Sequence, residues 1–132
     1  MRIDRRRAIT GVAGLAILGF APVAVAGMNG HAMYGLIGKM TATPGQRDAL
    51  CAILLEGLGR MPGCLSYVVA HDPADADTIW VTEVWTDEAA HRASLQVPEV
   101  REAIRKGMPL IATFGDAQVT RPVGGVGLLA GG

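Results

Sequence analysis

The segment TIWVTEVW, Thr78–Trp85, carries the strongest strand signal in this chain of 132 residues. It is dense in β-branched and aromatic residues, which fit the pleated surface of a β-sheet. Successive side chains of a strand point to opposite faces. The two predicted faces are Ile79, Val81, Glu83, Trp85 and Thr78, Trp80, Thr82, Val84. One face therefore holds a single carboxylate among large apolar side chains.

A second strand precedes this one. Cys64–His71 (CLSYVVAH) has strand composition, and the acidic turn Asp72–Asp77 (DPADAD) separates the two segments. Strict alternation along Cys64–His71 places Tyr67 on one face and Cys64 on the other.

Upstream, the sequence predicts a strand followed by a helix. His31–Met40 (HAMYGLIGKM) has the composition of the strand, and Thr43-Pro44-Gly45 opens the helix, with Thr43 as its cap. Met61-Pro62-Gly63 ends the helix. Apolar residues recur between these signals at spacings of three and four, which puts them on one helix face. They are Leu50, Ile53, Leu54, Leu58 and Met61.

Downstream, the sequence predicts two short helices and a last strand. The first helix starts at Thr86-Asp87-Glu88, where early acidic residues favour the helix dipole. The second starts at Val97-Pro98-Glu99 and ends at Gly107. The last strand is Asp116–Arg121. The order β-α-β-β-α-β predicts an α+β chain of the ferredoxin-like class.

The N-terminus has the pattern of an export signal. Met1–Arg7 contains four arginines, Ala8–Ala26 is uncharged, and the run ends on Ala24-Val25-Ala26, an Ala-x-Ala cleavage pattern. The Arg5-Arg6-Arg7 run resembles a twin-arginine (Tat) signal, with Ala8 where Phe is usual. We expect residues 1–26 to be a signal peptide, the protein to be periplasmic or secreted, and no stable membrane anchor to remain after cleavage.

The remainder divides into a linker at 27–32, a domain at 33–120 and a glycine-rich tail at 121–132. Because the leader holds four of the 12 basic and one of the 12 acidic residues, the remainder is acidic by three charges. A mildly acidic domain has no electrostatic attraction for nucleic acid. The tail is either flexible or an arm packed on a partner subunit.

Three motifs in this order resemble the antibiotic biosynthesis monooxygenase (ABM) family, and within it the quinol monooxygenases. They are Pro62–Tyr67 (PGCLSY), Val81–Trp85 (VTEVW) and a following helix with His91. Ala90–Leu95 and Gly107–Ile111 resemble one branch of the family. The resemblance covers roughly Met33–Val119.

The resemblance implies a homodimer in which the ferredoxin-like subunits pack their sheets into a dimeric α+β barrel. It also implies a pocket between the sheet and the helices of each subunit. Characterised members oxidise polycyclic phenols or quinols with O₂ and use neither a metal nor a flavin. Small aromatic substrates and O₂ are therefore the expected partners, with no cofactor.

Cofactor-free oxygenation needs a base in an apolar pocket. A phenol or quinol must lose a proton before it is electron-rich enough to pass an electron to O₂. His91 is the leading candidate, because imidazole titrates near neutral pH. The alternative is a helical histidine that faces solvent.

Glu83, Trp85 and Tyr67 complete the candidate site. Glu83 in an apolar strand is either bonded to a His, Tyr or Arg, or is a base with a raised pKa. Trp85 is either a pocket wall against a flat aromatic ligand or a core residue, and can be both. Tyr67 either hydrogen-bonds a substrate oxygen or is a half-buried strand tyrosine.

Other site chemistries lack support in the sequence. The three histidines form no HxH or HxxxH pair, and no GxGxxG or Walker motif is present. Cys51 and Cys64 are the only cysteines. We expect them to be free, buried thiols, although export would permit a disulfide.

Two other functions remain open. One is a non-catalytic dimeric barrel that binds a small apolar ligand, since chemistry does not follow from fold. The other is haem binding or degradation, for which the resemblance implies an Asn within the first strand. The only asparagine, Asn29, precedes that strand, which counts against haem.

Overall fold

The computed structural model describes residues 32–57 and 61–128. The predicted signal peptide, Asn29, His31 and Leu58 lie outside these residues. The elements follow in the order β1 (Tyr34–Ala42), α2 (Arg47–Glu56), β2 (Cys64–His71), β3 (Thr78–Trp85), α3 (Glu88–Ser94), α4 (Pro98–Gly107), the 3₁₀ turn η2 (Met108–Leu110) and β4 (Ile111–Thr120). The predicted ferredoxin-like α+β fold is confirmed.

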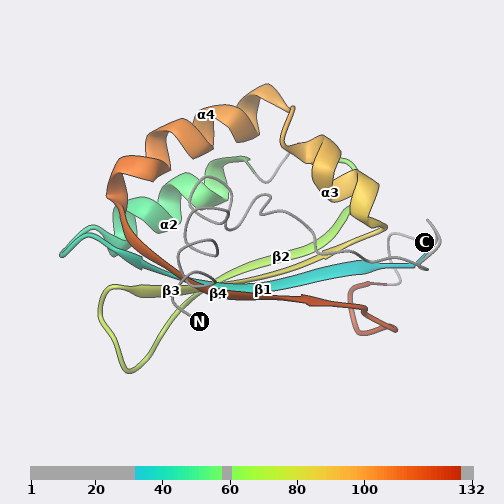
Figure 1. Ribbon diagram of the computed structural model, residues 1–132, viewed down its shortest axis with the longest axis horizontal. Helices are drawn as coiled ribbons and strands as arrows, with labels where there is room; N and C mark the ends of the chain where they lie inside the picture. The colour runs from blue at the N-terminus through green and yellow to red at the C-terminus, as the bar shows by residue number, and fades with distance from the viewer. Residues whose placement is uncertain (1–31, 58–60, 129–132) are drawn as a thin grey trace, which may run out of the picture.

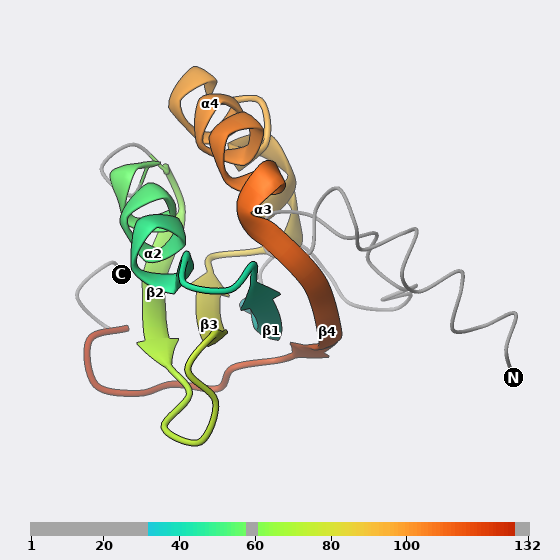
Figure 2. The ribbon, with the colours of Figure 1, turned by 90° about the vertical axis from the view of Figure 1, so that its left-hand side faces the viewer.

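Within the described residues, four strands form one antiparallel sheet in the order β2-β3-β1-β4. Figure 1 shows α2, α3 and α4 on the same face of this sheet. Figure 2, the view turned by 90°, shows that no helix of the described residues lies on the opposite face, which the segment after β4 crosses. The sheet therefore has one face packed under helices and one open face.

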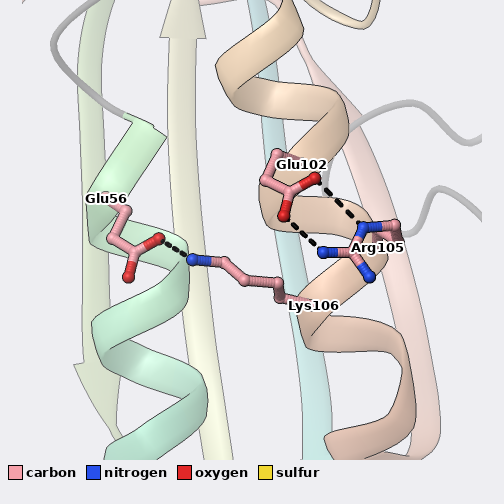
Figure 3. Close-up of polar contacts among 4 residues, drawn as sticks. All are labelled: Glu56, Glu102, Arg105 and Lys106. Carbon is pink, nitrogen blue, oxygen red and sulfur yellow. Dashed lines mark hydrogen bonds and ion pairs between the residues drawn. The ribbon is translucent and has the colours of Figure 1, made fainter.

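The core lies between the sheet and the helices. Its fully buried members come from the inward faces of the central strands and from one face of α2; they include Leu36, Met40, Leu50, Ile79, Val81 and Trp85. The helices α2 and α4 lie side by side, and Lys106 of α4 donates a hydrogen bond to Glu56 of α2 (Figure 3). Arg105 pairs with Glu102 along α4 itself.

The two strands that carry the resemblance have the predicted bounds, while other boundaries differ. The first strand begins at Tyr34, not His31, and the predicted last strand begins at Ile111, five residues early. The helix α2 begins at Arg47, after a turn in which Thr43 O accepts a hydrogen bond from Gln46 N, and has no side-chain cap. The prediction that Thr43 caps it was wrong.

The same helix is shorter than predicted. It ends at Glu56, so Met61 is buried in the core from outside the helix. No helix among the described residues is long and apolar enough to cross a membrane.

Candidate active site

Strand β3 brings Glu83 and Trp85 into the layer under the helices. Both side chains are buried, with 2% and 0% of their surface exposed. The indole Nε1 of Trp85 donates a hydrogen bond of 2.9 Å to Oε1 of Glu83. The predicted partners of Glu83 were His, Tyr or Arg; His91 does lie within ion-pair distance of it, and Trp85, two residues along the same strand, is an additional donor. Period-two alternation places both on one face, which makes this bond possible.

Helix α3 carries His91 over these two residues. Its start is held by Asp87, whose Oδ1 accepts a hydrogen bond of 2.7 Å from Ala90 N. The amide of Thr86 donates to Gly63 O at 2.8 Å, which ties the start of the helix to the segment before β2. His91 is consequently buried, with 3% of its surface exposed. The alternative of a solvent-facing histidine was wrong.

His91 packs among the aromatic side chains of two strands. Its ring centroid lies 5.3 Å from that of Trp85, edge to face, and 5.4 Å from that of Tyr34. Its Nε2 atom lies 3.9 Å from Oε1 of Glu83. We call Tyr34, Glu83, Trp85 and His91 the Glu83 cluster.

The environment of Glu83 changes its acidity. Burial raises the pKa of its carboxyl group to about 8, because the ion loses its hydration, and the hydrogen bond from Trp85 offsets only part of this effect. The carboxyl group therefore exchanges its proton near neutral pH. A group with that property suits general acid–base chemistry.

Tyr67 of β2 lies beside the Glu83 cluster. It lies directly across from Glu83 in the sheet register, and is half-buried. Burial, with Glu83 and Cys64 nearby, raises the pKa of its hydroxyl well above the ordinary value. The hydroxyl therefore remains a neutral hydrogen-bond donor.

Cys64 also faces the cluster. A register shift between Cys64 and Ser66 pairs Cys64 with Trp85 and Ser66 with Val84. Strict alternation was therefore wrong at the start of this strand, because the extra residue of a bulge reverses the faces before it. The cysteines Cys51 and Cys64 are free and half-buried.

Tyr34 is the member of the cluster that the sequence reasoning missed. It pairs with Trp85 across β1 and β3 and is 1% exposed. Burial and the nearby carboxylates of Glu88 and Glu83 raise the pKa of its hydroxyl to about 12. The sequence did contain one signal for Tyr34, namely an aromatic residue with a polar hydroxyl at the start of an apolar strand. The strand register needed to use it is a non-local property.

No group of three His, Cys, Asp or Glu side chains among the described residues could hold a metal ion. His71, at the end of β2, lies apart from the cluster and pairs with Asp48 through contact of 3.4 Å between Nε2 and Oδ1. The site that the structure assembles is thus a buried carboxyl–imidazole pair with aromatic neighbours.

Comparison with known proteins adds the family. The profile of the family described as antibiotic biosynthesis monooxygenase matches residues 33–106. Comparison with curated proteins gave no significant match.

Solved structures agree with the profile. A protein of Chloroflexus aurantiacus J-10-fl named for the same family is 63% identical over 74% of this chain and 99% of its own, with a TM-score of 0.72. SnoaB, a cofactor-independent oxygenase of Streptomyces nogalater, is 15% identical over 72% of this chain and 97% of its own, with a TM-score of 0.58. PA3566 of Pseudomonas aeruginosa is 22% identical over 72% of this chain and 96% of its own, with a TM-score of 0.58.

The likeness to SnoaB and PA3566 extends to the fold alone, whereas the Chloroflexus protein is a sequence relative. A profile that spans β1 to α4 and a relative of this identity show that the chain belongs to the antibiotic biosynthesis monooxygenase family.

Proposed function

We propose that this protein is a cofactor-independent monooxygenase that oxidises a quinol or a polycyclic phenol with O₂. The observation that carries the proposal is the buried carboxyl group of Glu83, with its raised pKa, beside His91. SnoaB, which shares the fold, is a cofactor-independent oxygenase. The family includes monooxygenases, which agrees with this chemistry.

The reaction needs no external reductant. A quinol and O₂ give a hydroxyquinone and water, so one oxygen atom enters the ring and the other leaves as water. The electrons that reduce O₂ come from the quinol itself. The protein must therefore bind the ring, remove the hydroxyl proton and keep water from the resulting anion.

The Glu83 cluster has groups for each of these tasks. Glu83 and His91 form the proton-accepting pair, with Trp85 holding the carboxylate in place through its indole N–H. Trp85 and Tyr67 offer aromatic surface to a flat ligand. In the anion that forms, negative charge on the substrate oxygen is best stabilised by neutral hydrogen-bond donors nearby.

The test is oxygen uptake by the purified protein with reduced 1,4-naphthoquinol or anthrone. We expect uptake well above the uncatalysed rate, and His91→Ala should lower kcat/KM by roughly 100-fold or more, as loss of a general base does. His71→Ala, which removes an exposed histidine outside the cluster, is the matched control and should retain full activity. Uptake at the background rate would overturn the proposal, and binding without uptake would favour the non-catalytic barrel.

A further inference from the structure

The hydroxyl of Tyr34 is a polar group of the cluster that has no role in the proposed proton transfer. It is the first residue of β1, lies directly across the sheet from Trp85, and packs its ring against the His91 imidazole. Its side chain is 1% exposed. The hydroxyl is thus fixed in the layer between the sheet and α3.

The hydroxyl of Tyr34 has no hydrogen-bond partner among the described residues. Buried hydroxyls in folded proteins are nearly always bonded, and each exception needs a reason. A polar atom that is fully buried and unbonded in the ligand-free chain is the expected state of a group whose partner is a ligand.

The surroundings determine what that ligand atom is. Glu83, Glu88 and Arg92 are the charged groups that act on the hydroxyl, and Glu88 and Arg92 pair with each other along α3 at 3.7 Å. Because the two carboxylates and burial keep the hydroxyl protonated far above neutral pH, it acts as a donor. Its complement is an oxygen acceptor on a ligand that lies beside His91 and Trp85, the aromatic neighbours of Tyr34.

We propose that Tyr34 is a specificity-determining residue whose hydroxyl donates a hydrogen bond to the oxygen of an aromatic alcohol bound beside His91. The proposal rests on the proposed function for the location of the ligand. It adds the group that distinguishes a hydroxylated ring from a plain hydrocarbon ring. A site that bonds a ligand oxygen discriminates strongly against ligands without it, because its own polar group is otherwise left unpaired.

The test compares two ligands of similar shape under anaerobic conditions, so that no turnover occurs. The full-length protein and the Tyr34→Phe variant are titrated with 1-naphthol and with 1-methylnaphthalene, which lacks the oxygen. Tyr34→Phe should weaken 1-naphthol binding by about fivefold, the worth of one hydrogen bond, and leave 1-methylnaphthalene binding unchanged or slightly tighter.

Thr78→Val is the matched control. It also removes a buried hydroxyl, but one that is within 3.3 Å of the Thr41 hydroxyl at the far end of β3. Thr78→Val should lower the melting temperature and change neither affinity. Tyr34→Phe should keep or raise the melting temperature of the free protein, because it deletes an unbonded hydroxyl.

Four results would overturn the proposal: equal weakening of both ligands, no change in either, failure of the wild-type protein to bind 1-naphthol, or a fall in the melting temperature of Tyr34→Phe. Oxygen uptake separates this proposal from the proposed function. Selective loss of 1-naphthol binding in a protein without oxygen uptake would support the role of Tyr34 and overturn the monooxygenase. If the protein takes up oxygen but Tyr34→Phe changes the affinity for neither ligand, the monooxygenase is supported and the role of Tyr34 is overturned.

Discussion

The carboxyl group of Glu83 is buried away from water and accepts a hydrogen bond from the indole N–H of Trp85. This single hydrogen bond replaces only part of the hydration that the ion loses. The protonated form is therefore stabilised relative to the ion. A purely structural site would gain more from an apolar side chain of similar volume, because burying an ionisable group costs free energy. The raised pKa of Glu83 agrees with the role in proton transfer that we propose for it.

The raised pKa makes folding stability depend on pH. In the folded chain the pKa of Glu83 is about 8, against an ordinary value of 4.5. Below about pH 4.5, the folded and the unfolded chain both hold the proton, and the free energy of unfolding has its full value. Between these values the unfolded chain releases the proton first, so the free energy of unfolding falls by roughly 1.4 kcal/mol per pH unit.

Urea unfolding at pH 5, 6, 7 and 8 measures this slope. Glu83→Gln should remove it, so that the variant gains stability relative to the wild type as the pH rises. Glu99→Gln changes an exposed glutamate of α4 and should leave the slope intact. Parallel curves for the wild type and Glu83→Gln would contradict the raised pKa.

Catalysis should follow the same ionisation with the opposite trend. A base must be deprotonated, so kcat/KM should rise about tenfold per pH unit below pH 8 and level off above it. Steady-state oxygen uptake between pH 6 and 9 checks this. Glu83→Gln should lose the rising limb of this pH profile. In the wild type, the midpoint of the limb should stay at the same pH when substrates of different acidity are used. A midpoint that follows the substrate would assign the limb to the substrate instead.

At the scale of elements, the position of α3 decides where His91 lies. The loop before β2 contacts the start of this helix at Gly63, whose φ is +86°. A Cβ atom at Gly63 would stand 2.6 Å from the Cβ of Ala90 and 3.0 Å from the hydroxyl of Thr86. Only glycine permits both this backbone conformation and this approach.

Gly63→Ala should therefore shift α3 and move His91 out of the cluster. We expect a loss of about 2–4 kcal/mol in the free energy of unfolding, from the strained φ and the clash together. Activity should fall as well. Gly45→Ala is the control, because Gly45 has a similar φ of +79° but nothing within 4 Å of the added Cβ atom.

The Gly45→Ala variant should lose about 1 kcal/mol in the free energy of unfolding, from the strained backbone conformation alone, and should keep its activity. Urea unfolding and oxygen uptake of both variants measure the two effects. Equal losses in the two variants would show that the contact with α3 has no role.

Local signals predict the elements near the site and miss what depends on distant pairing. The strands β2 and β3 have their predicted bounds, because β-branched and aromatic runs end there at turn-forming residues. The shared face of Glu83 and Trp85 follows from alternation alone. The early start of β4 was missed, because Gly115 and the polar residues around it weaken the strand signal.

The rest of the cluster depends on geometry between elements. Tyr34 joins it through its pairing with Trp85, and Cys64 faces it because of a bulge that alternation cannot show. The contact of His91 depends on how α3 crosses the sheet. Sequence motifs could nominate His91, Glu83, Trp85 and Tyr67, but neither the Trp85–Glu83 bond nor the unbonded Tyr34 hydroxyl.

At the scale of the whole molecule, no described helix packs on the open face of the sheet, which the segment after β4 crosses (Figure 2). Ile37 and Val68 flank Thr82 in the register, and both are exposed, as is Trp80 on the same face. Pro122, just after β4, lies against Gly35 at one end of this face, where a Cβ atom would come within 3.0 Å of it. Apolar side chains gathered on a sheet face of a small domain commonly mark an interface.

We expect this face to pair with that of a second copy, because a two-fold interface needs only one self-complementary patch. Light scattering at micromolar concentration should give twice the mass of the chain. Val68→Lys places a charge on the face at a position already exposed, so it should give a monomer with an unchanged circular dichroism spectrum. Ala52→Lys, on the exposed side of α2, should remain a dimer. A wild-type protein of monomer mass, or a Val68→Lys variant that stays dimeric, would rule out pairing through the open face.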